Sequence, residues 1–155
     1  MIIKFLKILF FIILFYQNPL YSKSKTLKDF NSKNLSNYFS GIVAYDNQYN
    51  KKALKFFQSS NFLIKKHDPY LKKYIYSLVL ENKIKKATSE IKQNLKNNNS
   101  NFFEAYLILA LDSLKEKDFK KSQNYLDKSF KFIKNDRLEL VIYETLKEYL
   151  IVFKE

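Results

Sequence analysis

From Asn34 onward, apolar residues recur every three or four positions, and short polar breaks interrupt the pattern. This period is typical of helices with one buried face, whereas a half-buried strand would alternate residue by residue. In the first segment, for example, Leu35, Tyr38 and Ile42 share one helical stripe. The pattern predicts seven helices, over residues 35–45, 50–63, 68–82, 83–95, 102–116, 118–133 and 137–153. The fold class that we expect is therefore all-α.

Polar residues stand where several of these helices are expected to begin. Asp68 is followed by Pro69, an order typical of a helix N-cap and the first helical position. Asn101, Asp118 and Asp136 precede the later helices. We expect each of these side chains to accept a hydrogen bond from the first turn of its helix.

A shared pattern recurs in the second helix of each successive helix pair. In YNKKALKFF, KIKKATSEI and DFKKSQNYL, two lysines precede a small residue, and an apolar residue follows four positions later. The small residues are Ala53, Ala87 and Ser122, which are 34 and 35 positions apart. The chain thus predicts three copies of one helix-pair unit.

This unit resembles the tetratricopeptide repeat (TPR), a helix-pair repeat of 34 residues. The resemblance implies a small residue on the first helix, a second small residue 12 positions later, and a large apolar residue four positions after that. These signature positions fall on Gly41, Ala53 and Phe57, on Ile75, Ala87 and Ile91, and on Ala110, Ser122 and Leu126. The first of them is the only glycine in the chain. The resemblance implies that it touches Ala53 where the two helices cross. The second repeat departs from the pattern at Ile75 and at Asn94, two positions where the family has small residues.

The resemblance also implies a binding surface. In the TPR family, the first helices of the pairs line a concave face that takes extended peptides or partner helices. The matching positions are Tyr38, Ile42, Tyr45, Lys72, Tyr76, Val79, Leu107, Leu111 and Leu114. Tyrosine suits such a face because it combines a large contact area with a polar tip. The alternative for each side chain is that it only packs against the next repeat.

The last predicted helix has more apolar surface than a terminal helix needs. One stripe suited to docking on the domain consists of Leu138, Val141, Ile142, Leu146, Tyr149 and Leu150. Further apolar residues lie on other sides of the helix, namely Leu140, Tyr143, Ile151 and Val152. Because the ends of solenoids are usually capped by a polar outer side, we expect this end to meet further repeats of a longer chain or a second copy.

The N-terminal segment has the organisation of an export signal. Lys4 and Lys7 precede an uninterrupted apolar run from Ile8 to Tyr16, and a polar stretch follows. The run is much shorter than the ~20 residues that a membrane-spanning helix needs. A basic start, a short apolar centre and a polar end are typical of a secretory signal peptide.

We therefore expect a signal peptide over residues 1–22, a linker over 23–33 and a repeat domain over 34–155. The domain would be located in the periplasm of a bacterium. The alternative is an uncleaved anchor in the inner membrane that faces the same compartment, and this segment is the only contact with a membrane that we expect.

The net charge of the chain is +13, which suggests nucleic acid or anionic lipid as a possible partner. Only Arg137 is an arginine, against 27 lysines, although arginine supplies most bidentate contacts to phosphates and guanine. No dense basic run is interleaved with aromatic residues, as a base-stacking surface would require. This argues against nucleic acid and favours a solvated lysine surface, with binding of anionic lipid or polyanions as an alternative function.

Catalytic and metal-binding chemistry is sparse. The chain has no cysteine and one histidine, His67, which we expect at the surface and which cannot build a metal cluster by itself. No Gly-rich phosphate loop and no HExxH motif is present. Glu144 and Glu148 have helical spacing and fit a solvated face. We expect no enzyme activity, cofactor or metal.

The function that we predict is therefore a non-enzymatic scaffold or adaptor in the cell envelope that binds a protein or peptide partner on the concave face. The alternative is a structural part of a larger envelope solenoid.

Overall fold

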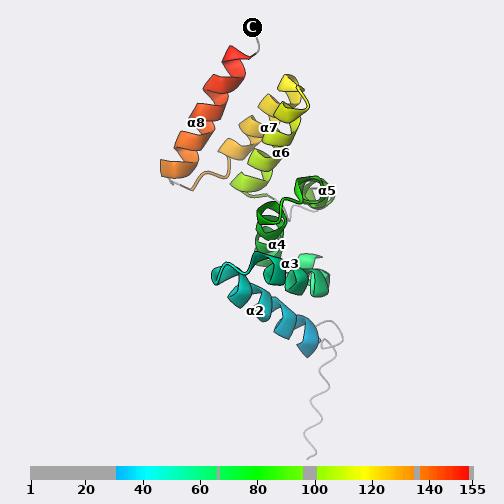
Figure 1. Cartoon of the computed structure of the whole chain (residues 1–155). Coiled ribbons are helices and arrows are strands. Elements are labelled where there is room, and N and C mark those ends of the chain that lie inside the picture. Colours follow the sequence, from blue (N-terminus) through cyan, green and yellow to red (C-terminus); the bar gives the residue numbers. More distant parts are fainter. Residues whose placement is uncertain (1–30, 66, 96–100, 135–136, 154–155) are drawn as a thin grey trace, which may run out of the picture. The chain divides into compact units, whose positions relative to one another are not determined.

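The computed structural model describes residues 31–65, 67–95, 101–134 and 137–153, and these ranges contain seven α-helices and a short 3-10 helix, η1, but no strand (Figure 1). The elements are α2 (Ser32–Asp46), α3 (Asn50–Ser59), η1 (Asn61–Lys65), α4 (Asp68–Leu80), α5 (Ile84–Leu95), α6 (Phe103–Lys115), α7 (Phe119–Phe130) and α8 (Arg137–Val152). The all-α prediction is confirmed. The predicted signal peptide, most of the predicted linker and the predicted cap at Asp136 lie outside the described residues.

The helix starts follow the predicted caps in part. Asp118 caps α7, because its carboxylate accepts the backbone N–H of Lys121 at 3.0 Å. The prediction for α4 is wrong by one residue, since the helix begins at Asp68 itself. At α6 the prediction is also wrong, since the N-cap residue is Phe102, without a side-chain cap. The side-chain oxygen of Asn101 accepts the hydroxyl of Tyr106 at 2.9 Å.

Helices that follow one another in the sequence pack together. α2 packs against α3, α4 against α5 and α6 against α7, and the pairs contact one another through α3–α4 and α5–α6. α8 then packs against α7. No helix among the described residues has both the length and the apolar character needed to cross a membrane.

The three helix pairs share one turn. Its central residue has a positive φ, of 62° at Gln48, 56° at Asn82 and 59° at Lys117. In each turn the N–H of this residue donates to the carbonyl three residues earlier, and the following N–H donates to the carbonyl five residues before it. These two bonds define the Schellman motif that commonly ends a helix. The turn residues are 34 and 35 positions apart, so the backbone geometry repeats with the spacing of the sequence pattern.

The signature residues lie in the core of all three pairs. The buried residues are Gly41, Ala53, Phe57, Ala87, Ile91, Ala110, Ser122 and Leu126. In the third pair, the Ser122 hydroxyl donates to the Ala110 carbonyl oxygen at 2.8 Å. The two small signature positions of the third pair, 12 residues apart, are thus in contact between α6 and α7.

In the first pair the residue nearest to a side chain added at Gly41 would be Phe57. A Cβ atom on Gly41 would lie 2.8 Å from Cε1 and 2.9 Å from Cδ1 of Phe57, and its three nearest atoms all belong to this ring. Carbon atoms in contact are normally about 3.5–4 Å apart. Gly41 therefore makes room for the Phe57 ring of α3, and the predicted contact with Ala53 stays a prediction.

α8 docks through part of the predicted stripe, since Leu150 is buried and Ile142 and Leu146 pack against the core, and through Tyr143, which the prediction placed elsewhere. Tyr143 and Leu150 are buried, and the Tyr143 ring lies 5.0 Å from that of Phe130 in α7. Val141 and Tyr149, which the prediction placed on the docking stripe, are about half exposed. The helix has apolar residues on nearly every side, so its periodicity identified only part of the face that packs.

Candidate functional site

The first predicted binding residue belongs to the core. The Tyr38 side chain is 7% exposed, and its hydroxyl lies 2.9 Å from Nε2 of His67. Its ring packs beside those of Phe57 and Tyr70, with centroids 6.2 and 5.8 Å away. Tyr38 is therefore not available to a partner, and His67, expected at the surface, is half-buried against it.

Ile42 and Tyr45 occupy an intermediate position. Both are half-buried and pack against the core of the first two helix pairs. The ammonium group of Lys73 lies 4.3 Å from the centroid of the Tyr45 ring, which is a favourable cation–π geometry. These two residues retain some accessible surface, but their main contacts are internal.

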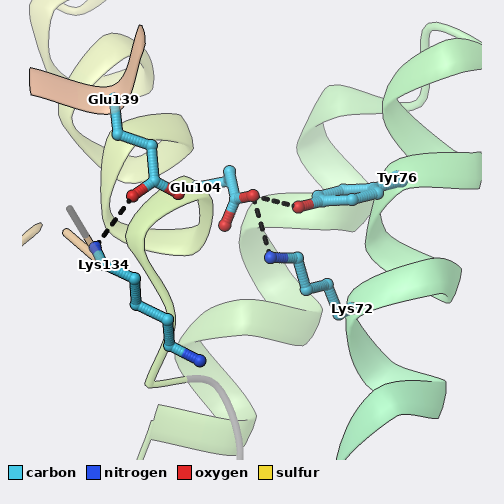
Figure 2. Close-up of polar contacts among 5 residues, drawn as sticks. All are labelled: Lys72, Tyr76, Glu104, Lys134 and Glu139. Carbon is cyan, nitrogen blue, oxygen red and sulfur yellow. Dashed lines mark hydrogen bonds and ion pairs between the residues drawn. The ribbon is translucent and has the colours of Figure 1, made fainter. Parts of the chain in front are cut away.

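A polar cluster joins α4 to α6 (Figure 2). Lys72 and Tyr76 project from adjacent turns of α4 toward Glu104 in the first turn of α6. The Tyr76 hydroxyl donates to Oε1 of Glu104, and the Lys72 ammonium group lies 2.9 Å from the same oxygen. Lys72 also lies 5.5 Å from the ring centroids of Tyr76 and Phe102. Lys72 and Tyr76, two of the predicted binding residues, thus both contact Glu104. The sequence pattern did not identify Glu104 as a binding residue.

The cluster keeps Glu104 ionised and Tyr76 neutral. Partial burial opposes the charge on Glu104, but the hydrogen bonds from Tyr76 and Lys72 outweigh this effect and lower the pKa of the carboxyl group. The pKa of Tyr76 is raised well above its usual range, first by burial and then by the carboxylate of Glu104 that it donates to. The carboxylate of Glu139 contributes in the same direction.

One oxygen of this cluster has hydrogen-bonding capacity to spare. Within the described ranges, Oε2 of Glu104 is buried and accepts no hydrogen bond, whereas Oε1 accepts from both neighbours. Glu139 is already engaged, because it accepts the backbone N–H of Lys134 at 3.2 Å (Figure 2). A buried acceptor without a partner is uncommon in native proteins. Among the described residues, Oε2 of Glu104 is therefore an acceptor without a partner, and it has almost no accessible surface.

An apolar groove begins one helical turn further along α6. It has a volume of 460 Å³ and lies between α6 and α8. Its lining consists of Leu107, Leu111, Leu114, Val141, Ile142, Thr145, Leu146 and Tyr149. The first three are predicted binding positions, and Glu104 precedes Leu107 on the same face of α6 because residues three apart are neighbours on a helix. We call this surface the α6–α8 groove.

A second groove is formed by the first helix pair, α2 and α3. Its volume is 640 Å³, and it is lined by Ser36, Phe39, Ser40, Val43, Ala44, Asn47, Tyr49 and Phe56 of α2, α3 and the turn between them. Phe39, Val43 and Tyr49 are strongly exposed there. None of these residues was among the predicted binding positions.

The predicted binding positions therefore separate into three groups. Tyr38 is core, Ile42 and Tyr45 are mostly internal, and Lys72, Tyr76, Leu107 and Leu111 lie at the polar cluster and the groove. The α8 side of the groove was missed, although the surplus of apolar residues in that helix was a signal for it. No protein-family model, curated protein or solved structure matches this chain.

Proposed function

We propose that this protein is a non-enzymatic scaffold or adaptor whose three helix pairs form a TPR-like solenoid, and that it binds a protein segment in the α6–α8 groove. The repeated Schellman turn, at a spacing of 34 and 35 residues, supports the repeat architecture. The observation that carries the binding function is the coincidence of two predicted binding leucines, Leu107 and Leu111, with an apolar groove.

The groove and the polar cluster together describe the partner. Apolar side chains of the partner fill the groove, and an N–H donor at one end lies beside the Glu104 carboxylate, whose side chain is 29% exposed. A lysine, an arginine or a free backbone N–H supplies this donor. The partner is therefore an apolar or amphipathic segment with a donor about one helical turn before its first apolar anchor, which agrees with the way grooves between helices take amphipathic helices.

The predicted export signal places this activity in the cell envelope, in the periplasm or at the inner membrane. Residues 1–22 lie outside the described residues, so this part of the proposal depends on the sequence pattern alone.

Site-directed photo-crosslinking tests the binding function. A photoreactive residue at position 111, in the full chain exported from living cells, is expected to capture a protein partner, and the same residue at position 80 is not. Leu80 is a matched control because it is 53% exposed, compared with 47% for Leu111, and lies outside the groove. In addition, Leu111→Asp should abolish the capture from a photoreactive residue at position 107, while Leu80→Asp should leave it unchanged. Equal capture at positions 80 and 111, or no capture at 111, would refute the groove as the binding site.

A second candidate function is a structural part of a longer envelope solenoid. The exposed apolar residues of α2 and α3 at one end, and of α8 at the other, favour it because stacked repeats cover such faces. Under this alternative, photo-crosslinks would form at position 43 and at position 152 alike. The lysine-rich surface is the remaining alternative, and binding through it would weaken steeply as salt is raised, whereas groove binding would not.

A further inference from the structure

α8 carries an exposed stripe that lies on the side away from its buried residues. The stripe consists of Leu138, Val141, Thr145, Tyr149 and Val152, all of them exposed and uncharged. At 3.6 residues per turn, the five side chains lie within about 40° of a common line along the helix. We call them the α8 stripe.

The spacing of the α8 stripe is the same in both directions along the helix. Counted from Thr145, Val141 and Tyr149 lie four residues before and after it. Leu138 and Val152 lie seven residues before and after it. A two-fold axis that passes through Thr145 perpendicular to the helix would therefore bring every residue of the stripe opposite another residue of the stripe. This self-complementarity is what the isologous interface of a closed dimer requires.

The antiparallel arrangement also matches side chains by size. It places Tyr149 opposite Val141 of the second copy, so that each large ring faces a small side chain. A parallel arrangement would place Tyr149 on Tyr149 and Val141 on Val141, which leaves the two helices unevenly spaced. In antiparallel packing the helix dipoles also point in opposite directions, which places opposite partial charges next to each other at the helix ends.

The apolar area is sufficient for a stable contact. The four large residues of the stripe are 49–69% exposed, which corresponds to on the order of 100 Å² for each side chain. Phe153, next to the stripe, and Leu111, across the α6–α8 groove, are about half exposed as well. Together with Thr145 they provide roughly 700 Å² per copy, close to the ~800 Å² that each partner buries in a standard interface.

We propose that the α8 stripe is a homodimer interface, in which the α8 helices of two copies pack antiparallel about a two-fold axis at Thr145. This inference goes beyond the adaptor function and does not depend on it. It has one consequence for that function. Val141, Thr145 and Tyr149 belong to both the stripe and the α6–α8 groove, so a segment bound in the groove competes with the second copy.

Single cysteine variants test the arrangement directly, because the chain has no cysteine of its own. Helices about 8–10 Å apart bring the Cα atoms at a facing two-fold position to within roughly 3.4–5.4 Å, given their ~2.3 Å backbone radius. This range overlaps the ~4.4–6.8 Å that separates the Cα atoms of a disulfide. Thr145→Cys in the full chain is therefore expected to oxidise to a covalent dimer.

Leu138→Cys alone should remain monomeric on a non-reducing gel, since the two copies of this residue would be about 21 Å apart along the helices. An equimolar mixture of Leu138→Cys and Val152→Cys should form the crosslinked dimer. Self-crosslinking of Leu138→Cys as efficient as that of Thr145→Cys would refute the antiparallel register.

Sedimentation of the full chain, purified from the envelope fraction, tests the dimer itself. The unaltered protein is expected to sediment as a dimer at micromolar concentration, and Val152→Asp is expected to raise the dissociation constant at least tenfold. Ile151→Asp is the matched control, because Ile151 is similarly exposed but lies off the stripe. Circular dichroism establishes that both variants keep their helices. A monomeric unaltered protein, or an equal effect of the two substitutions, would overturn the proposal and assign the stripe to another protein or to further repeats.

Discussion

Gly41→Ala is expected to destabilise the protein, although alanine is the better helix former. In the interior of a helix, alanine is favoured over glycine by about 1 kcal/mol. The added methyl group, however, would lie 2.8 Å from the Phe57 ring, roughly 0.7 Å inside normal contact distance. The ring has no free side to move toward, because it is fully buried and the ring of Tyr70 lies edge-on to it at 5.9 Å. Overpacking of this kind costs about 1–3 kcal/mol, so we expect a net loss of up to about 2 kcal/mol.

Urea unfolding followed by circular dichroism measures this change, provided that the slope of the transition stays constant. Ser36 supplies the matched control, because it is exposed on the same helix, α2. The difference between Ser36→Ala and Ser36→Gly gives the local preference for alanine without any clash, and we expect about 1 kcal/mol in favour of alanine. The change in the free energy of unfolding caused by Gly41→Ala should be less favourable than this value by at least about 1 kcal/mol.

A double-mutant cycle with Phe57→Leu assigns the loss to the ring. If the methyl group and the ring compete for the same space, Gly41→Ala should be tolerated better by at least about 1 kcal/mol when Phe57 is replaced by the smaller leucine. The reasoning is refuted if Gly41→Ala gains the full preference measured at Ser36, or if the effects of the two substitutions simply add.

Two further predictions concern the turns and the polar cluster. Lys117 has a φ of 59°, a conformation that costs residues with a side chain about 1–2 kcal/mol, so Lys117→Gly should raise the free energy of unfolding by up to ~1 kcal/mol. Lys55→Gly, in the exposed interior of α3, should lower it by about the same amount, and urea unfolding that shows the same sign at both positions would contradict the turn argument. Because the pKa of Glu104 is lowered in the folded protein, its contribution to stability is present above the ordinary value of 4.5 and is lost as the pH falls through the folded value. Thermal unfolding should therefore show a smaller loss of stability on acidification for Glu104→Gln than for the unaltered protein, and parallel curves would be evidence against the cluster.

Much of the candidate site was predictable from the repeat spacing. That spacing selected Lys72, Tyr76, Leu107 and Leu111, which the structure places at the polar cluster and the groove. The same spacing also selected Tyr38, which is core. Tyr38 and Lys72 occupy equivalent positions of the pattern, but Tyr38 is buried beside His67, whereas Lys72 reaches Glu104. Both neighbours are far away in the chain from the residue that they contact, so no local pattern predicts this difference.

The sequence by itself determined the helices and their repeated turn, because an amphipathic period and a helix-ending turn depend on residues close together in the chain. It also indicated that position 41 has no room for a side chain. Only the tertiary structure decided that the Phe57 ring fills this space, and that α8 buries Tyr143 and Leu150 while it leaves Val141 and Val152 exposed. Nearly every side of α8 is apolar, so the helix has several faces of similar hydrophobicity. The choice among them depends on shape complementarity with α7, and that shape exists only once the chain has folded.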